Sequence, residues 1–361
     1  MNILFLCGSA EQGKDGVGDY IRRLCGQLLR KGHKAQILSL CDIHTSHYFT
    51  ETQFVEGSSV TVSRIPMGTS YSQQMAWTQE ILNEGHFDWI SLQFVPYSFH
   101  SKGLPFWLPE FLSKLEGKHQ WHIMFHELWI GIEREITFKK KGVGFLQKRI
   151  IRQLEKSIVP KMVHTQSKIY QYYLSKIGIA AQYLPLFGNI AVTSSNHENS
   201  ELIKIVVFAT IHNNAPFEDF IIDLKKELEH LHKKAKFVFI GRHGALLNTW
   251  TAILKLHGID YELLGASSEE KISEVLMNSD YGISSTPYKI SDKSGVLAAM
   301  QEHELPIISV AKPWIDQDDI SVSFLDIIHY QKDNLNLMKP SRTRTNSLST
   351  VCDVFLKSIY N

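Results

Sequence analysis

Phosphate binding is the first chemistry that the sequence suggests, because a glycine-rich segment follows the opening apolar run. Residues Gly8–Lys14 fit the GxxxxGK spacing of a phosphate-binding P-loop. Asp15, however, stands where that motif needs a Ser or Thr hydroxyl for Mg²⁺, and no apolar run ends in the Asp of a Walker B strand. Ile21 replaces the third glycine of the dinucleotide fingerprint, so Gly16 and Gly18 do not complete it. The sequence predicts either a helix start that binds an anion or an ordinary loop between strand and helix.

A second helix start is also suited to phosphate. A strand that ends near Pro287 is followed by a polar loop, Tyr288–Lys293, and then by Ser294 and Gly295 at the start of a small-residue helix. Lys293, the Ser294 hydroxyl and free backbone N–H groups would lie at the carboxyl end of a strand, where open α/β sheets bind ligands. The alternative is a helix with a Ser cap and a solvated lysine.

Histidines form the third candidate group. His119, His122 and His126 have the spacing of a metal-binding helix face, but the segment has the pattern of a strand, on which they would not share one face. We therefore expect no metal there. His126, followed by Glu127, is expected at the carboxyl end of this strand, either in contact with a ligand or as a half-buried packing residue.

A basic segment, Phe138–Lys161, has eight basic residues and a single acid, Glu155. Its helical apolar stripe is formed by Val143, Leu146, Ile150, Leu154 and Ile158. The basic side chains include Lys148, Arg149, Arg152 and Lys156. Such a helix suits an anionic lipid surface or an anionic acceptor, and the alternative is a surface helix with solvated lysines.

These residues must be positioned by alternating strands and helices, which indicate parallel sheets. The expected strands of the first half are Ile3–Cys7, Ala35–Leu40, Val60–Ile65, Trp89–Phe94, His122–Phe125 and Met162–Thr165. Those of the second half are Lys204–Phe208, Phe237–Ile240, Asp260–Leu264, Tyr281–Ser284 and Ile307–Val310. We expect a first domain at 1–188, a linker at 189–203, a second domain at 204–335, and a C-terminal helix within 336–361 that packs back on the first domain.

Composition sets the class of protein. The chain has 361 residues, 43% hydrophobic and 21% charged, with a net charge of +1, which excludes a disordered chain and a bulk nucleic-acid binder. Its four cysteines form no CxxC pair and indicate free thiols in a reducing compartment. No apolar stretch reaches the length of a membrane span, so we expect a cytoplasmic protein or one attached to the inner face of a membrane.

Taken together, the motifs resemble the GT-B glycosyltransferases, and most of all the retaining enzymes of glycosyltransferase family 4. The matching segments, in order, are Gly16–Tyr20, Gly32-His33, Leu92–Phe94, Phe125–Glu127, Tyr183–Pro185, Phe239–Gly241, Leu263–Gly265, Ser279-Asp280, Lys293–Gly295 and His303–Pro306. The resemblance implies an α/β fold of two Rossmann-like domains that face each other across a cleft. The first domain would be the acceptor side and the second would bind the nucleotide sugar.

Site residues follow from this resemblance. It implies that Gly16, Val17 and Gly18 let the backbone approach the donor diphosphate and that His126 contacts the donor sugar near the reacting carbon. It implies that Gln93 and Glu127 lie on the acceptor side, that Leu264 borders the nucleobase, and that the second domain holds the diphosphate. The residues that would hold the diphosphate are Arg242, Lys293, Ser294, Gly295 and Val296. No cofactor and no metal are expected, and the departing phosphate itself takes the acceptor's proton.

The sequence departs from the family at two places. The usual Arg and Lys after the first strand of the donor domain are missing from Ala209–Phe217, where Arg242 is the candidate substitute. The family's paired glutamates would fall at Ser291 and Ala299. We expect a retaining transfer of a hexose-type sugar to a glycan or lipid-linked acceptor, with Lys148, Arg149 and Arg152 as the membrane or acceptor patch. The alternatives are a catalytically weak nucleotide-sugar-binding subunit and, further off, a P-loop-like hydrolase.

Overall fold

The computed structural model describes residues 1–55, 57–193, 202–337 and 347–360. They form two compact units, which are described separately. Unit 1 comprises Met1–Pro185, Asp316–Asp319 and the C-terminal segment from Leu348, whereas unit 2 comprises Leu186–Ile315 and the segment that begins at Ile320. The expected linker at 189–203 lies partly outside the described residues, as does the start of the expected segment 336–361.

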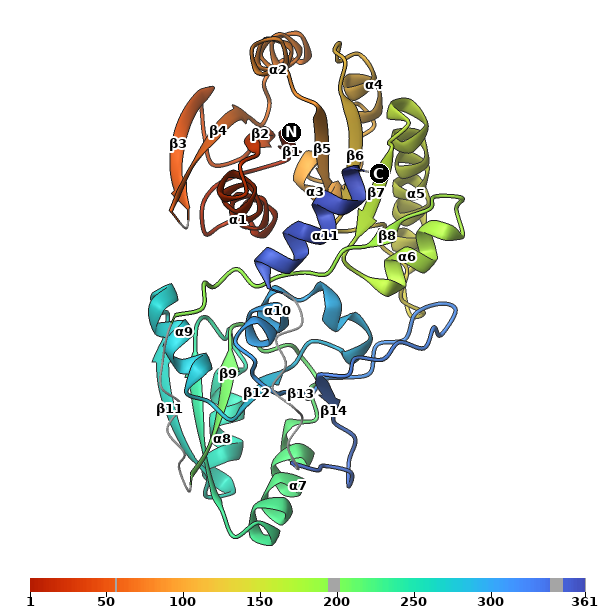
Figure 1. The fold of residues 1–361 in the computed structure, drawn as a ribbon. Coiled ribbons are helices and arrows are strands. Elements are labelled where there is room, and N and C mark those ends of the chain that lie inside the picture. The colour runs from red at the N-terminus through yellow and green to blue at the C-terminus, as the bar shows by residue number, and fades with distance from the viewer. Residues whose placement is uncertain (56, 194–201, 338–346, 361) are drawn as a thin grey trace. The chain divides into compact units, whose positions relative to one another are not determined.

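Unit 1 is built on an eight-stranded sheet with the order β3-β4-β2-β1-β5-β6-β7-β8 (Figure 1). The strands are β1 (Asn2–Cys7), β2 (Lys34–Asp42), β3 (Phe49–Val55), β4 (Ser58–Pro66), β5 (Trp89–Phe94), β6 (Gln120–Phe125), β7 (Met162–Thr165) and β8 (Gln182–Tyr183). All neighbouring pairs are parallel except β3 and β4, which form an antiparallel pair at the edge. The sequence analysis missed β3 because its alternating polar residues give no continuous apolar run.

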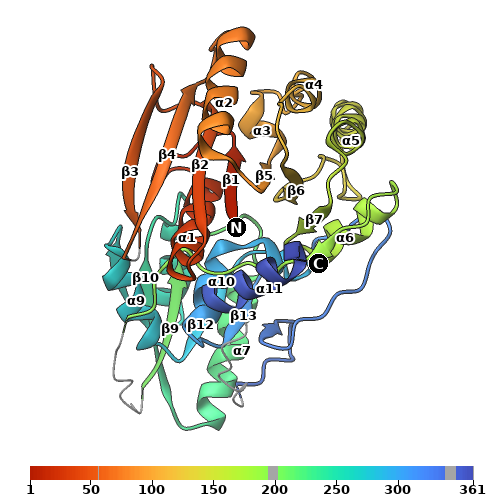
Figure 2. The ribbon, with the colours of Figure 1, turned by 45° about the horizontal axis from the view of Figure 1, so that its top comes forward.

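The helices of unit 1 connect these strands and cover the sheet. They are α1 (Gly16–Arg30), α2 (Tyr71–Gly85), α3 (Pro96–Phe99), α4 (Leu108–Ser113), α5 (Phe138–Ile158), α6 (Lys168–Ser175) and α11 (Leu348–Tyr360). The C-terminal helix α11 lies beside α1 in both views (Figures 1 and 2). Its Phe355 is buried against Phe5 of β1, so the end of the chain completes the core of unit 1.

Unit 2 contains a six-stranded sheet of the order β11-β10-β9-β12-β13-β14, in which every neighbouring pair is parallel. Its strands are β9 (Leu202–Phe208), β10 (Lys234–Ile240), β11 (Asp260–Gly265), β12 (Tyr281–Ser284), β13 (Ile307–Ser309) and β14 (Ile327–His329). Its helices are α7 (Phe217–His230), α8 (Leu247–Leu256), α9 (Glu269–Met277), the 3₁₀ helix η1 (Tyr288–Lys293) and α10 (Gly295–Glu302). η1 replaces the polar loop expected there.

The central strand β9 explains why helices cover both faces of this sheet. Ile203, Ile205 and Val207 belong to a core with α7 and α8, while Val206 and Phe208 belong to a second core with α9 and α10. Alternate residues of a strand point to opposite faces, so a continuous apolar strand requires cover on both sides. This arrangement is the doubly wound α/β architecture, and it confirms the expected class of two Rossmann-like domains.

The boundary between the units falls slightly before the expected one. Leu186–Gly188, which the sequence analysis assigned to the first domain, belong to unit 2. The reason is packing: an added Cβ on Gly188 would lie only 2.6 Å from the Cα of Ala299 in α10. Conversely, Asp316 returns to unit 1, where it is fully buried and accepts a hydrogen bond from the Tyr173 hydroxyl at 2.9 Å.

Candidate functional site

A polar group at the carboxyl edge of the unit 1 sheet surrounds His126. Gln93 lies near the end of β5, His126 directly follows β6, and Gln166 directly follows β7. The three strands are parallel neighbours, so their carboxyl ends meet at one edge. His126 Nε2 lies 2.8 Å from Gln93 Oε1, and its Nδ1 lies 3.1 Å from Gln166 Oε1. The sequence analysis placed Gln93 and His126 at this edge but missed Gln166.

His126 is more enclosed than the resemblance implies. Its side chain is 8% exposed, and the Tyr20 ring of α1 meets it edge-on with 5.2 Å between ring centroids. Burial raises the pKa of Tyr20 above its usual range, so this phenol is neutral. The Gln93 carbonyl oxygen contacts His126 Nε2, whereas Glu127 is exposed. The amide oxygens of Gln93 and Gln166 thus contact both nitrogens of the ring.

The glycine-rich loop before α1 uses its own acidic side chains to satisfy its N–H groups. Asp15 caps α1 by accepting a hydrogen bond from the Gly18 N–H at 2.6 Å. Asp19 accepts from the Gly13 N–H at 2.9 Å. Burial raises the pKa of Asp15, which is the cost of enclosing a carboxyl group here. The helix start that the sequence suggested for an anion therefore holds a carboxylate of the chain itself.

Gly16 and Gly18 differ in their surroundings. An added Cβ on Gly16 would meet no atom within 4 Å. An added Cβ on Gly18 would lie 3.0 Å from the Cα of Ala10 and 3.3 Å from the Ser9 carbonyl oxygen. Gly18 is thus required by packing between the loop and α1, while the space at Gly16 is open to an approaching ligand.

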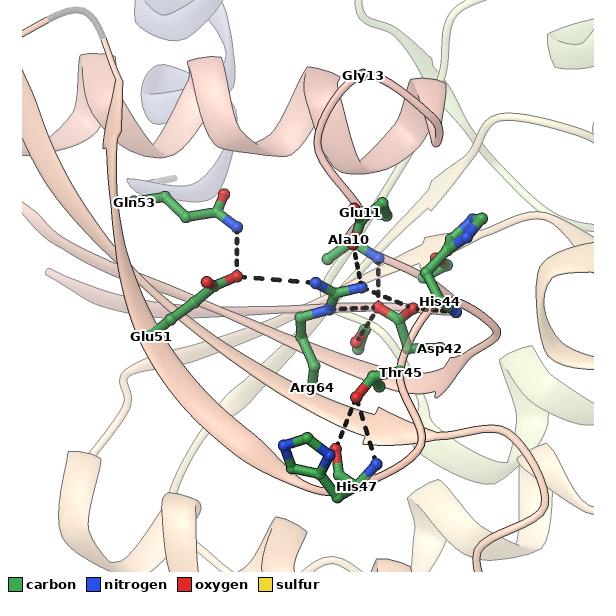
Figure 3. Close-up of polar contacts among 12 residues, drawn as sticks. Ala10, Glu11, Gly13, Asp42, His44, Thr45, His47, Glu51, Gln53 and Arg64 are labelled. Carbon is green, nitrogen blue, oxygen red and sulfur yellow. Dashed lines mark hydrogen bonds and ion pairs between the residues drawn. The ribbon is translucent and has the colours of Figure 1, made fainter.

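A buried ion pair anchors this loop to the sheet (Figure 3). Arg64 of β4 donates to both carboxylate oxygens of Asp42 at 2.8 and 3.0 Å, and it also pairs with Glu11 of the loop. Asp42 in turn accepts a hydrogen bond from the Ala10 N–H at 3.0 Å. Although burial raises the pKa of Asp42, Arg64 and these N–H donors lower it to about 2. The loop position is therefore determined by charge pairing that no sequence motif revealed.

Four of the donor residues expected in unit 2, Lys293–Val296, lie at the start of α10. Ser294 is the N-cap of this helix and accepts a hydrogen bond from the Leu297 N–H at 3.4 Å. Lys293 ends η1 directly before it, and Gly295 is exposed. Val296 and Leu264 are both partly buried against the same hydrophobic core. The structure thus brings Lys293–Val296 and Leu264 to one side of the unit 2 sheet.

One difference from the family that the sequence resembles has a local explanation in unit 2. Ala299 is fully buried in α10, where it packs on Gly188, so a glutamate would not fit at that position. Arg242 is exposed, just after β10. Next to it, His243 is buried and lies 2.7 Å from the Ala209 carbonyl oxygen through its Nδ1. This contact fixes the loop after β9, where the usual Arg and Lys are absent.

The basic helix α5 differs from the expected patch in one member. Lys148 lies 4.7 Å from the centroid of the Trp129 ring, and burial lowers its pKa, so it is not a freely solvated cation. Arg149 and Arg152 are exposed as expected. Phe138 and Phe145 are also exposed, at 90% and 66% of their surface. The sequence pattern indicated only the buried stripe and did not predict that these two rings are exposed.

A pocket of about 310 Å³ opens in unit 1 near the ends of β2 and β4. Its lining residues are Leu40, Cys41, Met67, Gly68, Thr69, Tyr71, Gln74, Phe99, His100, Ser101 and Trp107. None of these is Asp, Glu, Lys or Arg. His100 Nδ1 accepts hydrogen bonds from the backbone N–H groups of Lys102 and Leu104, which leaves its Nε2–H as a donor. The pocket combines aromatic walls with neutral polar groups.

Within the part of the chain that the structure describes, no group of three or more His, Cys, Asp and Glu side chains is placed to hold a metal ion. Among the same residues, no helix is long and apolar enough to cross a membrane.

No protein-family model matches the sequence, and no curated protein is similar to it in sequence. Solved structures are similar in fold. A glycosyltransferase from Rickettsia africae has a TM-score of 0.54 at 13% identity, over 99% of this chain and 88% of its own. Anabaena Alr3699/HepE in complex with UDP and glucose has a TM-score of 0.51 at 12% identity, over 100% of this chain and 90% of its own. The apo form of the lipopolysaccharide outer core galactosyltransferase WaaB also has a TM-score of 0.51 at 12% identity, over 99% of this chain and 89% of its own. The chain shares the GT-B fold of these proteins.

Proposed function

We propose that this chain is a glycosyltransferase that moves a hexose-type sugar from a nucleotide diphosphate sugar to a glycan or lipid-linked acceptor. The observation that carries the proposal is a likeness to solved glycosyltransferases that extends over nearly the whole chain, through both units. Retention of configuration and independence from metal follow the resemblance to family 4. In that reaction the bond from the anomeric carbon to the phosphate oxygen breaks, the acceptor oxygen forms a bond to that carbon on the same face, and the departing phosphate takes the acceptor's proton.

The donor is proposed to bind unit 2 at the carboxyl edge of its sheet. Lys293 supplies positive charge, and the start of α10 supplies N–H groups for the diphosphate. Leu264 borders the nucleobase, and Arg242 takes the place of one missing cation. Because the Anabaena protein is solved with UDP, a uridine nucleotide is the first to test.

The acceptor is proposed to bind unit 1. His126 is proposed to contact the donor sugar. The neutral aromatic pocket at Tyr71 and Trp107 suits an uncharged sugar ring, since aromatic faces stack on apolar surfaces. Helix α5 is proposed to attach the protein to the inner face of a membrane through Arg149, Arg152 and the exposed phenylalanines.

A catalytically weak nucleotide-sugar-binding subunit is the second candidate function. It is favoured by the Asp15 carboxylate, which occupies the helix start expected to face the donor, and by the buried Ala299 at the position of a family glutamate. The first reduces the charge complementarity to a diphosphate, and the second removes a carboxylate that would accept hydrogen bonds from sugar hydroxyl groups. Neither affects the fold.

The test is calorimetric titration with UDP, GDP and ADP, followed by turnover of the sugar donors of whichever nucleotide binds. Binding together with sugar transfer supports the enzyme. Nucleotide binding without donor hydrolysis or sugar transfer above background supports the binding subunit. If none of the three nucleotides binds, both functions are contradicted.

A further inference from the structure

A chain of polar side chains crosses the interior of unit 1 behind His126. Its members, in spatial order, are Gln166, His126, Gln93, Ser91, His122 and His164, and each is at most 8% exposed. They occupy alternate positions along β5, along β6 and its end, and along β7 and its end, so they share one face of the sheet. On that face Phe355 of α11 lies against His122 and His164, with centroid distances of 5.2 and 6.3 Å. The C-terminal helix thus packs over the two histidines.

The links between neighbours are short. His164 Nδ1 lies 3.0 Å from His122 Nε2, and His122 Nδ1 lies 2.7 Å from the Ser91 hydroxyl. The Gln93 amide N–H donates to the same hydroxyl at 2.7 Å, while its carbonyl oxygen lies 2.8 Å from His126 Nε2. Each polar group is therefore constrained by the next.

The direction of these hydrogen bonds follows from the number of protons. Burial lowers the pKa of His122 well below its usual range and that of His164 to about 4, so both rings are neutral. Ser91 accepts from Gln93, and its single proton then goes to His122 Nδ1. His122 must carry its own proton on Nε2, which donates to His164 Nδ1. His164 therefore carries its proton on Nε2, an atom with no hydrogen-bond partner among the described residues.

The proton position on His126, at the other end of the chain of side chains, follows in the same way. Because the Gln93 N–H is used by Ser91, the amide presents only its oxygen to His126, and His126 Nε2 must be protonated. To reverse the direction of these hydrogen bonds, the Gln93 amide would have to turn over while Ser91 and two imidazoles change their proton positions together. The members of the chain are therefore coupled.

We propose that Ser91, His122 and His164 are positioning residues that hold the ring proton of His126 on Nε2 by fixing the orientation of the Gln93 amide. The inference deepens the proposed function, and only its kinetic consequence rests on that function. It assigns to three buried residues a role in setting the hydrogen-bonding state of the ring that would face the sugar.

The first test uses the wild-type full-length chain. Long-range proton–nitrogen NMR spectra of the chain with ¹⁵N-labelled histidine, assigned by ring-to-backbone correlations, distinguish the two neutral tautomers near neutral pH. We expect the Nε2–H tautomer at His122 and His164 and a retained Nε2 proton at His126. An Nδ1–H tautomer at His122 or His164 would overturn the proposal.

The second test breaks the chain at Ser91. Ser91→Ala removes the hydroxyl, so His126 should show both tautomers, whereas Ser91→Thr keeps the hydroxyl and should restore the single form. Ser113→Ala, at an exposed serine of α4, is the control and should change nothing. If His126 keeps one tautomer in Ser91→Ala, the positioning role is contradicted, and a failure of Ser91→Thr to fold leaves the wild-type spectra to decide.

The kinetic readout separates the two proposals. Ser91→Ala should lower kcat by on the order of tenfold with little change in the KM for the donor, since misorientation of a reacting-site group acts on the transition state. An unchanged kcat would contradict the positioning role. A wild-type chain with the expected tautomers and no transferase activity would contradict the proposed function and leave this inference intact.

Discussion

At the scale of single residues, acidic side chains determine the character of the loop before α1. Asp15 caps the helix at the start that we propose faces the diphosphate, and Asp42 holds the loop through the Ala10 N–H. A carboxylate at a helix start is stabilised by the same N–H groups and dipole that would attract a phosphate. Ligand and cap therefore compete for one place.

Replacing Asp15 tests this competition. Asp15→Asn keeps a good N-cap but removes a negative charge, so nucleoside diphosphate binding should tighten by about 0.3 to 1 kcal/mol at low salt. Calorimetric titration measures the change. Glu110→Gln, at an exposed acid on α4, is the matched control and should leave affinity unaltered. Equal affinity for Asp15→Asn and wild type would remove this loop from the donor site.

A pair of glycine variants tests whether a ligand approaches the same loop. Gly16→Ala adds a methyl group in open space and should leave the thermal unfolding midpoint unchanged or slightly higher. Gly18→Ala should lower it, because the loop must shift away from Ala10. If the backbone contacts a diphosphate, Gly16→Ala alone weakens binding without loss of stability. Unchanged binding by Gly16→Ala would make the loop structural only.

The Asp42–Arg64 pair predicts a defined pH dependence of stability. The folded pKa of Asp42 is about 2, below the ordinary value near 3.8, so folding is favoured by the ionised form. Its contribution, on the order of 2 kcal/mol, is fully present above about pH 4 and is lost as the pH falls through the folded pKa. Urea unfolding followed from neutral to acid pH measures it. Asp42→Asn should flatten the curve in that window, and a slope as steep as that of wild type would show that other groups are responsible.

At the scale of elements, helix α5 has two different faces. Ile150, Leu154 and Ile158 are buried and attach it to unit 1, which leaves exposed arginines and two exposed phenylalanines. A basic surface with aromatic side chains suits the interface of an anionic bilayer, where charges attract and rings insert. Lys148 does not belong to this surface because it packs on Trp129.

Vesicle sedimentation tests this assignment. The double variant Arg149→Gln and Arg152→Gln should weaken binding to anionic vesicles by up to roughly 30-fold at low salt, since each basic residue contributes about 1 kcal/mol. The charge-matched control Lys233→Gln with Lys234→Gln changes exposed lysines of unit 2 and should have no effect. Phe138→Ser should lower binding further without changing charge. Sedimentation that is absent in the wild type would mean that α5 is an ordinary solvated helix.

At the scale of the whole molecule, two parallel sheets each present a carboxyl edge, and the chain crosses between the units more than once. The segment at Asp316 and helix α11 both belong to unit 1, although they follow most of unit 2 in the sequence. In the donor site that we propose in unit 2, Lys293 and the start of α10 supply the positive charge that faces the diphosphate. If these groups neutralise the diphosphate, binding needs no metal ion.

Metal independence is therefore a prediction for the complete protein. Nucleoside diphosphate binding should survive excess EDTA, whereas Lys293→Ala should weaken it by about 1.5 to 3 kcal/mol through loss of a charge-assisted contact. Lys234→Ala, at the amino end of β10 and so at the opposite edge of the sheet, is the control. Loss of binding on chelation, or an unaffected Lys293→Ala variant, would overturn the donor-site proposal.

The amino-acid sequence by itself determined the elements whose patterns are local. Trp89–Phe94, Met162–Thr165 and Tyr281–Ser284 are the strands that apolar runs predicted, with the same bounds. The alternation of such runs with amphipathic helices was sufficient to predict a fold of two Rossmann-like domains. These features depend on hydrophobic periodicity, which a single segment carries without its neighbours.

Only the tertiary structure decided which polar residues meet. Ser91, His122 and His164 are far apart in the sequence, and each alone is typical of any strand. Their hydrogen bonds depend on the register of β5, β6 and β7, which the whole sheet sets. The cap by Asp15 and the stacking of Lys148 on Trp129 likewise depend on side-chain direction in three dimensions. Burial makes such contacts strong, and burial is a property of the assembled fold rather than of a motif.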